Sequence, residues 1–178
     1  EREIPEIGSG TVKIMGIARE PGFRSKVAVA TDDNSIDPIG ACIGQRGGRI
    51  QTIIAELGGE KIDVVHYDET SEKYISNALS PAKILGVDLN SETKEATVRV
   101  GSDQFSLAIG KSGQNVRLAS QLVGWKIKVV EDGTDKVVAA DDDASIAESA
   151  TIGSLDAGSL DATPLGSNEL GGNGMDSI

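Results

Sequence analysis

Apolar residues recur with helical spacing at two places in the chain. In each place they fall at intervals of three or four residues, which predicts a helix with a single apolar stripe. The stripes consist of Ile50, Ile53, Ile54 and Leu57 and of Val116, Ala119, Leu122 and Val123. A glycine follows each stripe, Gly58 or Gly124, at the position where a left-handed residue commonly ends a helix.

Runs of aliphatic and β-branched residues predict three strands in each half of the chain. The turn-forming sequences EPG and NSE separate the first two strands of the respective halves. Asp37 and Asp103 are placed to N-cap the helix before each glycine loop, and short helical segments are expected at 1–7 and 71–80. The expected strands are residues 11–18, 26–31 and 61–67, then 83–89, 96–100 and 126–130.

The two halves repeat one another. KIMGI at 13–17 is echoed by KILGV at 83–87, and EKIDVV at 60–65 by WKIKVV at 125–130. A shared order with small changes in length indicates two related domains. Both have the order helix–strand–strand–helix–loop–helix–strand, so the fold class is α+β.

We place the first domain at 1–69, the second at 70–132 and a tail at 133–178. Each domain has about 65 residues and is small enough to bury only about 60% of the surface of its unfolded chain, so we expect the two to pack on each other. The tail is rich in Asp, Ser, Gly and Ala, and its composition predicts disorder.

Negative charge is concentrated in the C-terminal part of the chain. From Glu131 onward there are 11 acidic residues and one lysine, Lys136, which leaves 17 acidic and 16 basic residues in the remainder. The net charge of −11 therefore does not argue against a nucleic-acid partner for the two domains. The tail is either a solvated extension or an electrostatic competitor that masks basic loops.

Composition also indicates in which cellular compartment the protein is expected. A single cysteine excludes an internal disulfide framework and suits a reducing compartment, so we expect a cytoplasmic protein. No apolar run is long enough for a membrane span and no signal-peptide pattern is present, so we expect no membrane partner. Because the first residue is Glu1, we expect the chain to be part of a longer protein. We expect it to be a monomer.

A Gly-x-x-Gly loop precedes each apolar helix. The sequences are IGQRGGRI at 43–50 and IGKSGQNV at 109–116. Such a turn presents backbone N–H groups near the positive end of a helix, where phosphate binds favourably. One loop of this kind is weak evidence in a chain with 22 glycines, but two at matching positions are strong evidence.

These loops resemble the signature of KH domains, and the order of elements resembles the type II form of that fold. The segments AREPGFRSKVAV at 18–29, LSPAKI at 79–84 and LAIGKSGQNVRLA at 107–119 further resemble the tandem KH region of the bacterial NusA family of transcription factors. The resemblance covers about the first 130 residues. It implies binding of single-stranded RNA, with the loop clamping about four backbone nucleotides beside an aliphatic groove.

The resemblance implies an RNA-binding part of a factor that regulates transcription pausing, termination and antitermination, with the nascent transcript as ligand. The RNA polymerase complex would be reached through parts of the protein outside this chain, because the N-terminal and OB-fold domains of the family are absent here. The implied RNA-binding residues are Ile43, Gly44, Gln45, Arg46, Gly47, Arg49, Ile50, Ile109, Gly110, Lys111, Ser112, Gly113, Gln114, Asn115, Val116 and Arg117.

The alternative is a KH-fold module that docks a transcription or ribosomal protein without touching RNA. An enzyme is not expected, because no carboxylate pair, Ser-His or Cys-His arrangement appears. The GKS at 110–112 is not a P-loop, since Phe105 stands where that motif needs glycine. His66 has no metal-ligand partner, Cys42 and Trp125 are expected to be packing residues, and neither a metal nor a cofactor is expected.

Overall fold

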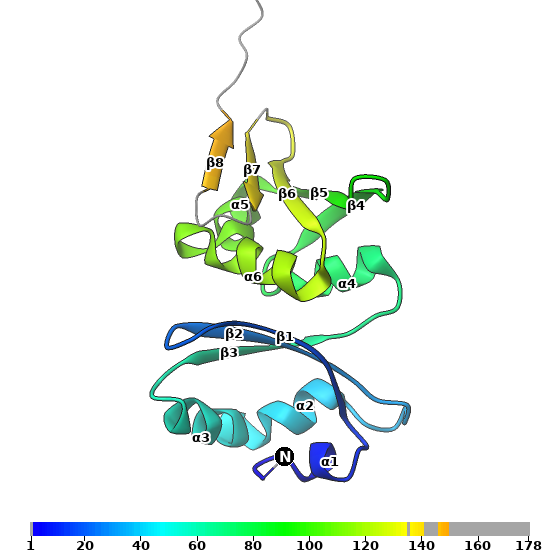
Figure 1. The fold of residues 1–178 in the computed structure, drawn as a ribbon, viewed down its shortest axis with the longest axis vertical. Coiled ribbons are helices and arrows are strands. Elements are labelled where there is room, and N and C mark those ends of the chain that lie inside the picture. Colours follow the sequence, from blue (N-terminus) through cyan, green and yellow to red (C-terminus); the bar gives the residue numbers. More distant parts are fainter. Residues whose placement is uncertain (1, 135, 141–145, 150–178) are drawn as a thin grey trace, which may run out of the picture.

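The computed structural model describes residues 2–134, 136–140 and 146–149. They form two units stacked one above the other (Figure 1). The first contains α1 (Pro5–Gly8), β1 (Lys13–Glu20), β2 (Arg24–Ala30), α2 (Pro38–Ile43), the 3-10 turn η1 (Gln45–Gly47), α3 (Gly48–Glu56) and β3 (Lys61–His66). The second contains α4 (Ser71–Ala78), β4 (Ile84–Asn90), β5 (Glu95–Val100), α5 (Ser102–Ile109), η2 (Lys111–Gly113), α6 (Gln114–Val123), β6 (Lys126–Glu131), β7 (Val137–Ala140) and β8 (Ile146–Ser149).

The two sheets share one topology, as the sequence repeat predicts. In the first unit β1 pairs antiparallel with β2, and β2 pairs in parallel with β3. β4, β5 and β6 repeat this arrangement in the second unit. A register shift interrupts both antiparallel pairs, between Ile14 and Gly16 and between Ile84 and Gly86. The α+β class and the tandem arrangement are therefore confirmed.

The boundary of the tail differs from expectation. Residues 137–140 and 146–149 were assigned to the tail, yet they form β7 and β8 and extend the second sheet to the order β4-β5-β6-β7-β8. Val138 and Ala140 of β7 are buried in the core of the second unit, which gives this short strand its apolar anchorage. For residues 135, 141–145 and 150–178 of the tail, the predicted disorder lies outside the residues that the structure describes.

Of the two predicted N-cap residues, one is confirmed and the other is wrong. Asp37 caps α2 as predicted, its Oδ1 accepting a hydrogen bond of 3.1 Å from the Ile39 amide. Asp103 is not a cap, because α5 begins earlier, with Gly101 as N-cap and its carbonyl accepting from the amides of Gln104 and Phe105. The leading helix expected at 1–7 is also shorter, since α1 spans only Pro5–Gly8. Pro5 is its first residue, where the missing N–H of proline removes no hydrogen bond from the helix.

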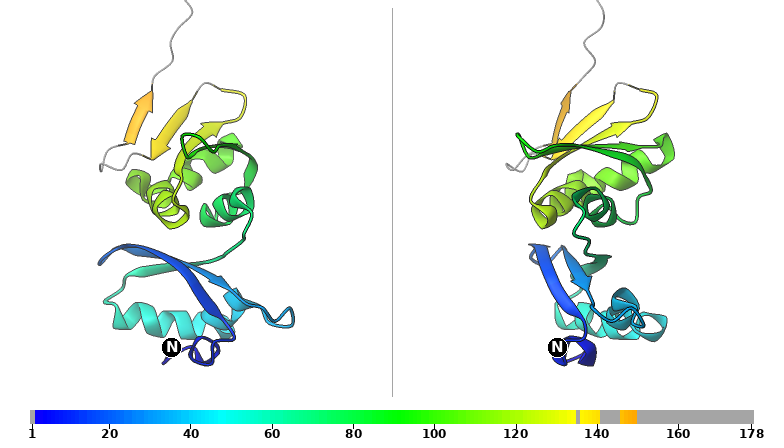
Figure 2. Two further views of the ribbon diagram at one scale, coloured as in Figure 1. Left: turned by 45° about the vertical axis from the view of Figure 1, so that its right-hand side comes forward. Right: turned by 90° about the vertical axis from the view of Figure 1, so that its right-hand side faces the viewer.

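The sheet of the first unit packs against α4 and α6 of the second, as both views in Figure 2 show. Gly16 makes room for this contact, since a Cβ there would lie 3.2 Å from Leu122 Cδ1 and 3.3 Å from the Tyr74 hydroxyl. The fully buried Lys26 donates through Nζ to the Ser80 carbonyl oxygen at 3.1 Å. Asn77 donates to the His66 carbonyl oxygen at 3.1 Å. The two units thus share a polar and apolar interface.

Candidate nucleic-acid interface

The two Gly-x-x-Gly loops have almost the same backbone. Their first glycines have φ, ψ of 72°, 175° and 76°, 176°, and their third residues both have φ of 52°. Their final glycines have φ of 77° and 72°. The six residues, in order, are Gly44, Arg46 and Gly47, then Gly110, Ser112 and Gly113. Three positive φ values within four residues turn the chain sharply between two helices and direct it into the N-terminus of the second.

The first glycine of each loop is required by close packing as well as by φ. A Cβ on Gly44 would lie 2.7 Å from Arg49 Cγ, and one on Gly110 would lie 2.9 Å from the Asn115 amide nitrogen. Around Gly47, in contrast, nothing lies within 4 Å of such a Cβ. The first glycine of each loop therefore lets the following helix approach, while Gly47 of the first loop serves only the turn.

The residue five positions after each first glycine fastens the loop to the preceding helix. Arg49 Nη1 donates to the Ala41 carbonyl oxygen at 2.7 Å and to both Glu6 carboxylate oxygens at 3.0 Å. Asn115 Nδ2 donates to the carbonyl oxygens of Leu107 at 3.2 Å and Ala108 at 3.0 Å. Both side chains thus occupy backbone acceptors at the C-terminal end of the preceding helix. They support the loops rather than extend from them.

The two middle residues of each loop point away from the protein body. Gln45, Arg46, Lys111 and Ser112 are all exposed. Among the ion pairs formed by the described residues, none includes Arg46 or Lys111. These two cations are therefore available to an anionic ligand that approaches the loop amides.

Arg117 and Gln114 have a partner in the other unit. Arg117 Nε donates to Glu20 Oε1 at 2.9 Å, and Gln114 Nε2 donates to Glu20 Oε2 at 2.7 Å. Burial acts to raise the pKa of the Glu20 carboxyl, but the hydrogen bonds from Gln114 and Arg117 outweigh it and lower that pKa. Glu20 is therefore ionised at neutral pH and ties the start of α6 to the first unit.

The aliphatic residues that flank the loops differ in accessibility. Ile43 is 37% exposed, and Ile50 and Ile109 are half-buried. Val116 is fully buried in the core of the second unit. Of these four, only the three isoleucines present surface to a ligand.

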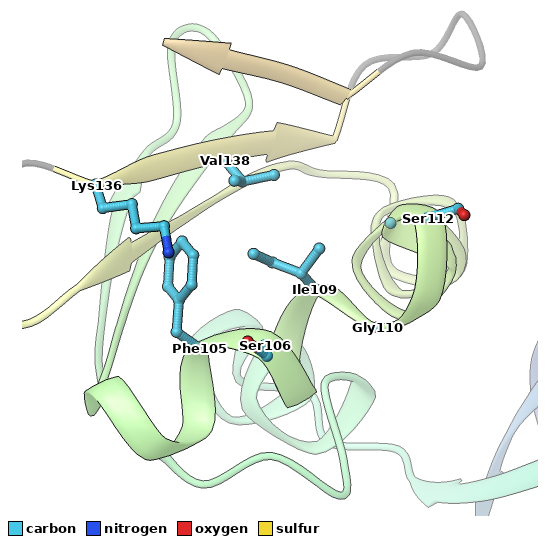
Figure 3. Close-up of a pocket in the computed structure, with 8 residues that line it drawn as sticks. Phe105, Ser106, Ile109, Gly110, Ser112, Lys136 and Val138 are labelled. Atoms are coloured by element: carbon cyan, nitrogen blue, oxygen red, sulfur yellow. The ribbon is translucent and has the colours of Figure 1, made fainter. Parts of the chain in front are cut away.

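A pocket of about 370 Å³ lies beside the second loop (Figure 3). Phe105, Ile109, Lys136 and Val138 point into it, and Gly110, Ser112 and Gly113 complete its lining with Ser106. Lys136 Nζ lies 4.8 Å from the centroid of the Phe105 ring, a cation–π contact. Lys136 is not among the site residues predicted from the sequence, although it is the single basic residue after Glu131, and this isolated positive charge could have identified it.

Other candidate chemistry is not assembled in the part of the chain that the structure describes. No group of three His, Cys, Asp or Glu residues could hold a metal there, and no described helix is long and apolar enough to cross a membrane. Cys42 is buried, and burial followed by the nearby Glu6 carboxylate raises the pKa of its thiol, which disfavours the thiolate. Trp125 packs in the core of the second unit, as expected.

Both units are similar to known protein families. A family model of the NusA-like first KH domain matches residues 1–67, and one of the NusA-like second KH domain matches residues 71–137. Residues 1–137 belong to the NusA-like tandem KH family. The KH region is similar to that of the transcription termination/antitermination protein NusA of Bacillus subtilis, at 53% identity over 129 residues, 72% of this chain and 35% of the relative.

Two further comparisons extend this result. The NusA protein of Thermus thermophilus is 53% identical over 131 residues, which are 74% of this chain and 34% of the relative. The crystal structure of APE1850 is similar to this chain, with a TM-score of 0.52 and 28% sequence identity. The similar part covers 73% of this chain and 95% of the APE1850 chain. The chain spans about a third of the length of the NusA proteins it matches.

Proposed function

We propose that this chain binds single-stranded RNA through its two Gly-x-x-Gly loops, as the RNA-binding part of a NusA-like termination and antitermination factor. The observation that carries the proposal is the near-identity of the two loop backbones, each with an exposed cation at its tip that takes part in none of the ion pairs of the described residues. A turn that points free amides at the N-terminus of a helix is a site for phosphate, and an extended chain of phosphates can engage two such sites at once.

The role in transcription rests on the relatives. The similar proteins of Bacillus subtilis and Thermus thermophilus are named transcription termination/antitermination proteins. This chain corresponds to about a third of their length, so we assign to it the contact with the transcript and assign contacts with RNA polymerase to the remainder of such a protein.

Replacement of the loop tips tests the proposal. The variant Gln45→Asp/Arg46→Asp/Lys111→Asp/Ser112→Asp places carboxylates where phosphates would lie, and aspartate tolerates the left-handed backbone of positions 46 and 112. We expect filter binding of short single-stranded RNA to be lost while circular dichroism and the melting temperature stay as in the parent chain.

A charge-matched control separates loop contacts from net charge. Lys73, Lys83 and Lys94 are exposed and lie outside both loops, so Lys73→Asp/Lys83→Asp/Lys94→Asp should weaken binding far less than the loop variant. Equal binding by the loop variant and the parent would refute the proposal. Absence of RNA binding by the parent chain would favour the protein-docking alternative.

A further inference from the structure

The strands that border the two loops differ at their outer edges. β3 and β6 hold the same place in the repeat, since β3 pairs in parallel with β2 and β6 pairs in parallel with β5. β7 pairs antiparallel with β6, with Lys128 opposite Ala139 and Val130 opposite Val137. No strand among the described residues pairs with the outer edge of β3. Among the described residues, the outer edge of β3 therefore lacks a partner strand, although its His66 carbonyl oxygen accepts a hydrogen bond from Asn77, whereas β7 occupies the same edge of β6.

The aliphatic side chains near the loops are also more accessible in the first unit than in the second. Three positions of the first unit are half-buried, whereas their counterparts in the repeat are fully buried. The pairs are Ile50 with Val116, Ile62 with Ile127 and Val64 with Val129. Because an aliphatic side chain must be accessible to pack against a base, this surface is available in the first unit and closed in the second.

β7 and the residue before it also contribute side chains to the surface beside the second loop. Its Val138 points toward Ile109 and Phe105, and Lys136, just before the strand, lies over the Phe105 ring (Figure 3). The space beside the second loop is a pocket whose wall carries a cation, Lys136, and whose lining includes the glycines of the loop. Such a site suits a phosphate group and offers little to a base.

We propose that the two loops have different tasks: the first unit reads bases, whereas the second unit holds only the phosphate backbone, with Lys136 as an additional phosphate contact. This inference rests on the proposed function, since it assigns parts of one RNA to the two units. Base edges are recognised by hydrogen bonds and apolar contact, which need a free strand edge and an accessible aliphatic surface. Phosphate contacts fix position and carry no sequence information.

The test measures affinity and preference separately on the full chain. A randomised single-stranded RNA pool is selected against the parent chain, and dissociation constants are then measured for one enriched RNA and for its scrambled counterpart. The ratio of the two constants reports base reading. Ile43→Ala and Ile109→Ala are a matched pair, because these residues hold the same place before the two loops.

We expect Ile43→Ala to lower the ratio about tenfold, the effect of removing about two methylene groups from a contact with a base. Ile109→Ala should leave the ratio unchanged. Lys136→Gln should weaken both RNAs by the same factor and so leave the ratio unchanged too. Lys94→Gln is the control for Lys136→Gln, because Lys94 also lies over an aromatic ring, with its Nζ 4.7 Å from the centroid of Trp125. Trp125 follows the C-terminal end of α6, away from the loop at its N-terminal end, so Lys94→Gln should alter neither dissociation constant.

Three results would overturn the inference. They are a ratio lowered by Ile109→Ala or Lys136→Gln, a ratio unaffected by Ile43→Ala, or no enrichment of any sequence by the parent chain. Each result counts only where filter binding shows that the parent chain binds RNA, so the proposed function survives it. Failure of the parent chain to bind any RNA would instead remove the proposed function itself.

Discussion

Arg117 and Glu20 are 97 positions apart in sequence, yet Arg117 Nε lies 2.9 Å from Glu20 Oε1. Glu20 is the last residue of β1 in the first unit, and Arg117 lies in the first half of α6, just after the second loop. Both side chains are less than a third exposed, so water screens their interaction only in part. This pair fixes the position of the second loop relative to the first unit.

Removal of Glu20 should therefore destabilise the protein measurably. Glu20→Ala deletes the acceptor for both Gln114 and Arg117 and leaves a half-buried guanidinium without its partner. We expect the free energy of unfolding to fall by about 1–2 kcal/mol, measured by urea denaturation. The control is Asp32→Ala, whose ion pair with Lys13 is largely exposed and should contribute less than about 0.5 kcal/mol. A loss of equal size in both variants would contradict the interface role of Glu20.

The loop glycines predict a second difference in stability. Gly47→Ala forces alanine to φ of 77° but meets no atom within 4 Å, so it should cost about 1–2 kcal/mol from backbone strain alone. Gly110→Ala places alanine at φ 76°, ψ 176°, a region open essentially only to glycine, and also brings its Cβ to 2.9 Å from the Asn115 amide nitrogen, so it should cost about 1–3 kcal/mol more. Urea denaturation of the two variants measures the difference. Equal costs would show that neither the ψ angle of Gly110 nor the close approach of α6 to it matters.

The Glu60 carboxylate predicts how stability depends on pH. Its side chain is fully buried and accepts hydrogen bonds from Arg19, from the Ser25 hydroxyl and from the Gly22 amide. The bonds from Arg19, followed by those from Ser25 and Gly22, lower its pKa from 4.5 to about 2. A pKa lowered by folding means that the stabilisation is complete above pH 4.5 and is lost as pH falls toward 2.

Glu60→Gln should therefore be less stable than the parent chain at neutral pH, and this difference should shrink between pH 4.5 and pH 2. Denaturation midpoints at a series of pH values measure the effect. Glu92→Gln, at an exposed position in the β4–β5 turn, is the control and should show no comparable change. A constant difference between parent and Glu60→Gln across this range would contradict the role assigned to the carboxylate.

The sequence predicted the elements well because the same pattern occurs twice. Helical spacing, glycine positions and the repeat located both loops and six of the eight described strands, β1 to β6, each to within a few residues. β7 escaped prediction because Val137–Ala140 is short, and its burial depends on pairing with β6. A four-residue apolar run next to an acidic segment carries no periodicity that reveals such a partner.

The site was predicted less completely than the fold, for a related reason. Local sequence identified the loop tips, but the partners of Arg49, Asn115 and Arg117 depend on tertiary structure. Arg117 is bound by a residue of the other unit, and Arg49 by Glu6 near the N-terminus and by the preceding helix. Charge near a loop was sufficient to suggest a phosphate contact, whereas the competing carboxylates become visible only in the folded chain.

This difference among the basic residues gives the last prediction. Arg46 and Lys111 are exposed and outside the described ion pairs, so each can neutralise a phosphate, whereas Arg117 already neutralises Glu20. The slope of log affinity against log salt should become shallower by about 0.7 for Arg46→Gln and again for Lys111→Gln, the value for one phosphate on a single strand. Arg117→Gln should leave that slope nearly unchanged while lowering the free energy of unfolding. Titrations with single-stranded RNA at several salt concentrations measure all three slopes, and a full loss of about 0.7 in Arg117→Gln would show that RNA displaces Glu20 from its guanidinium.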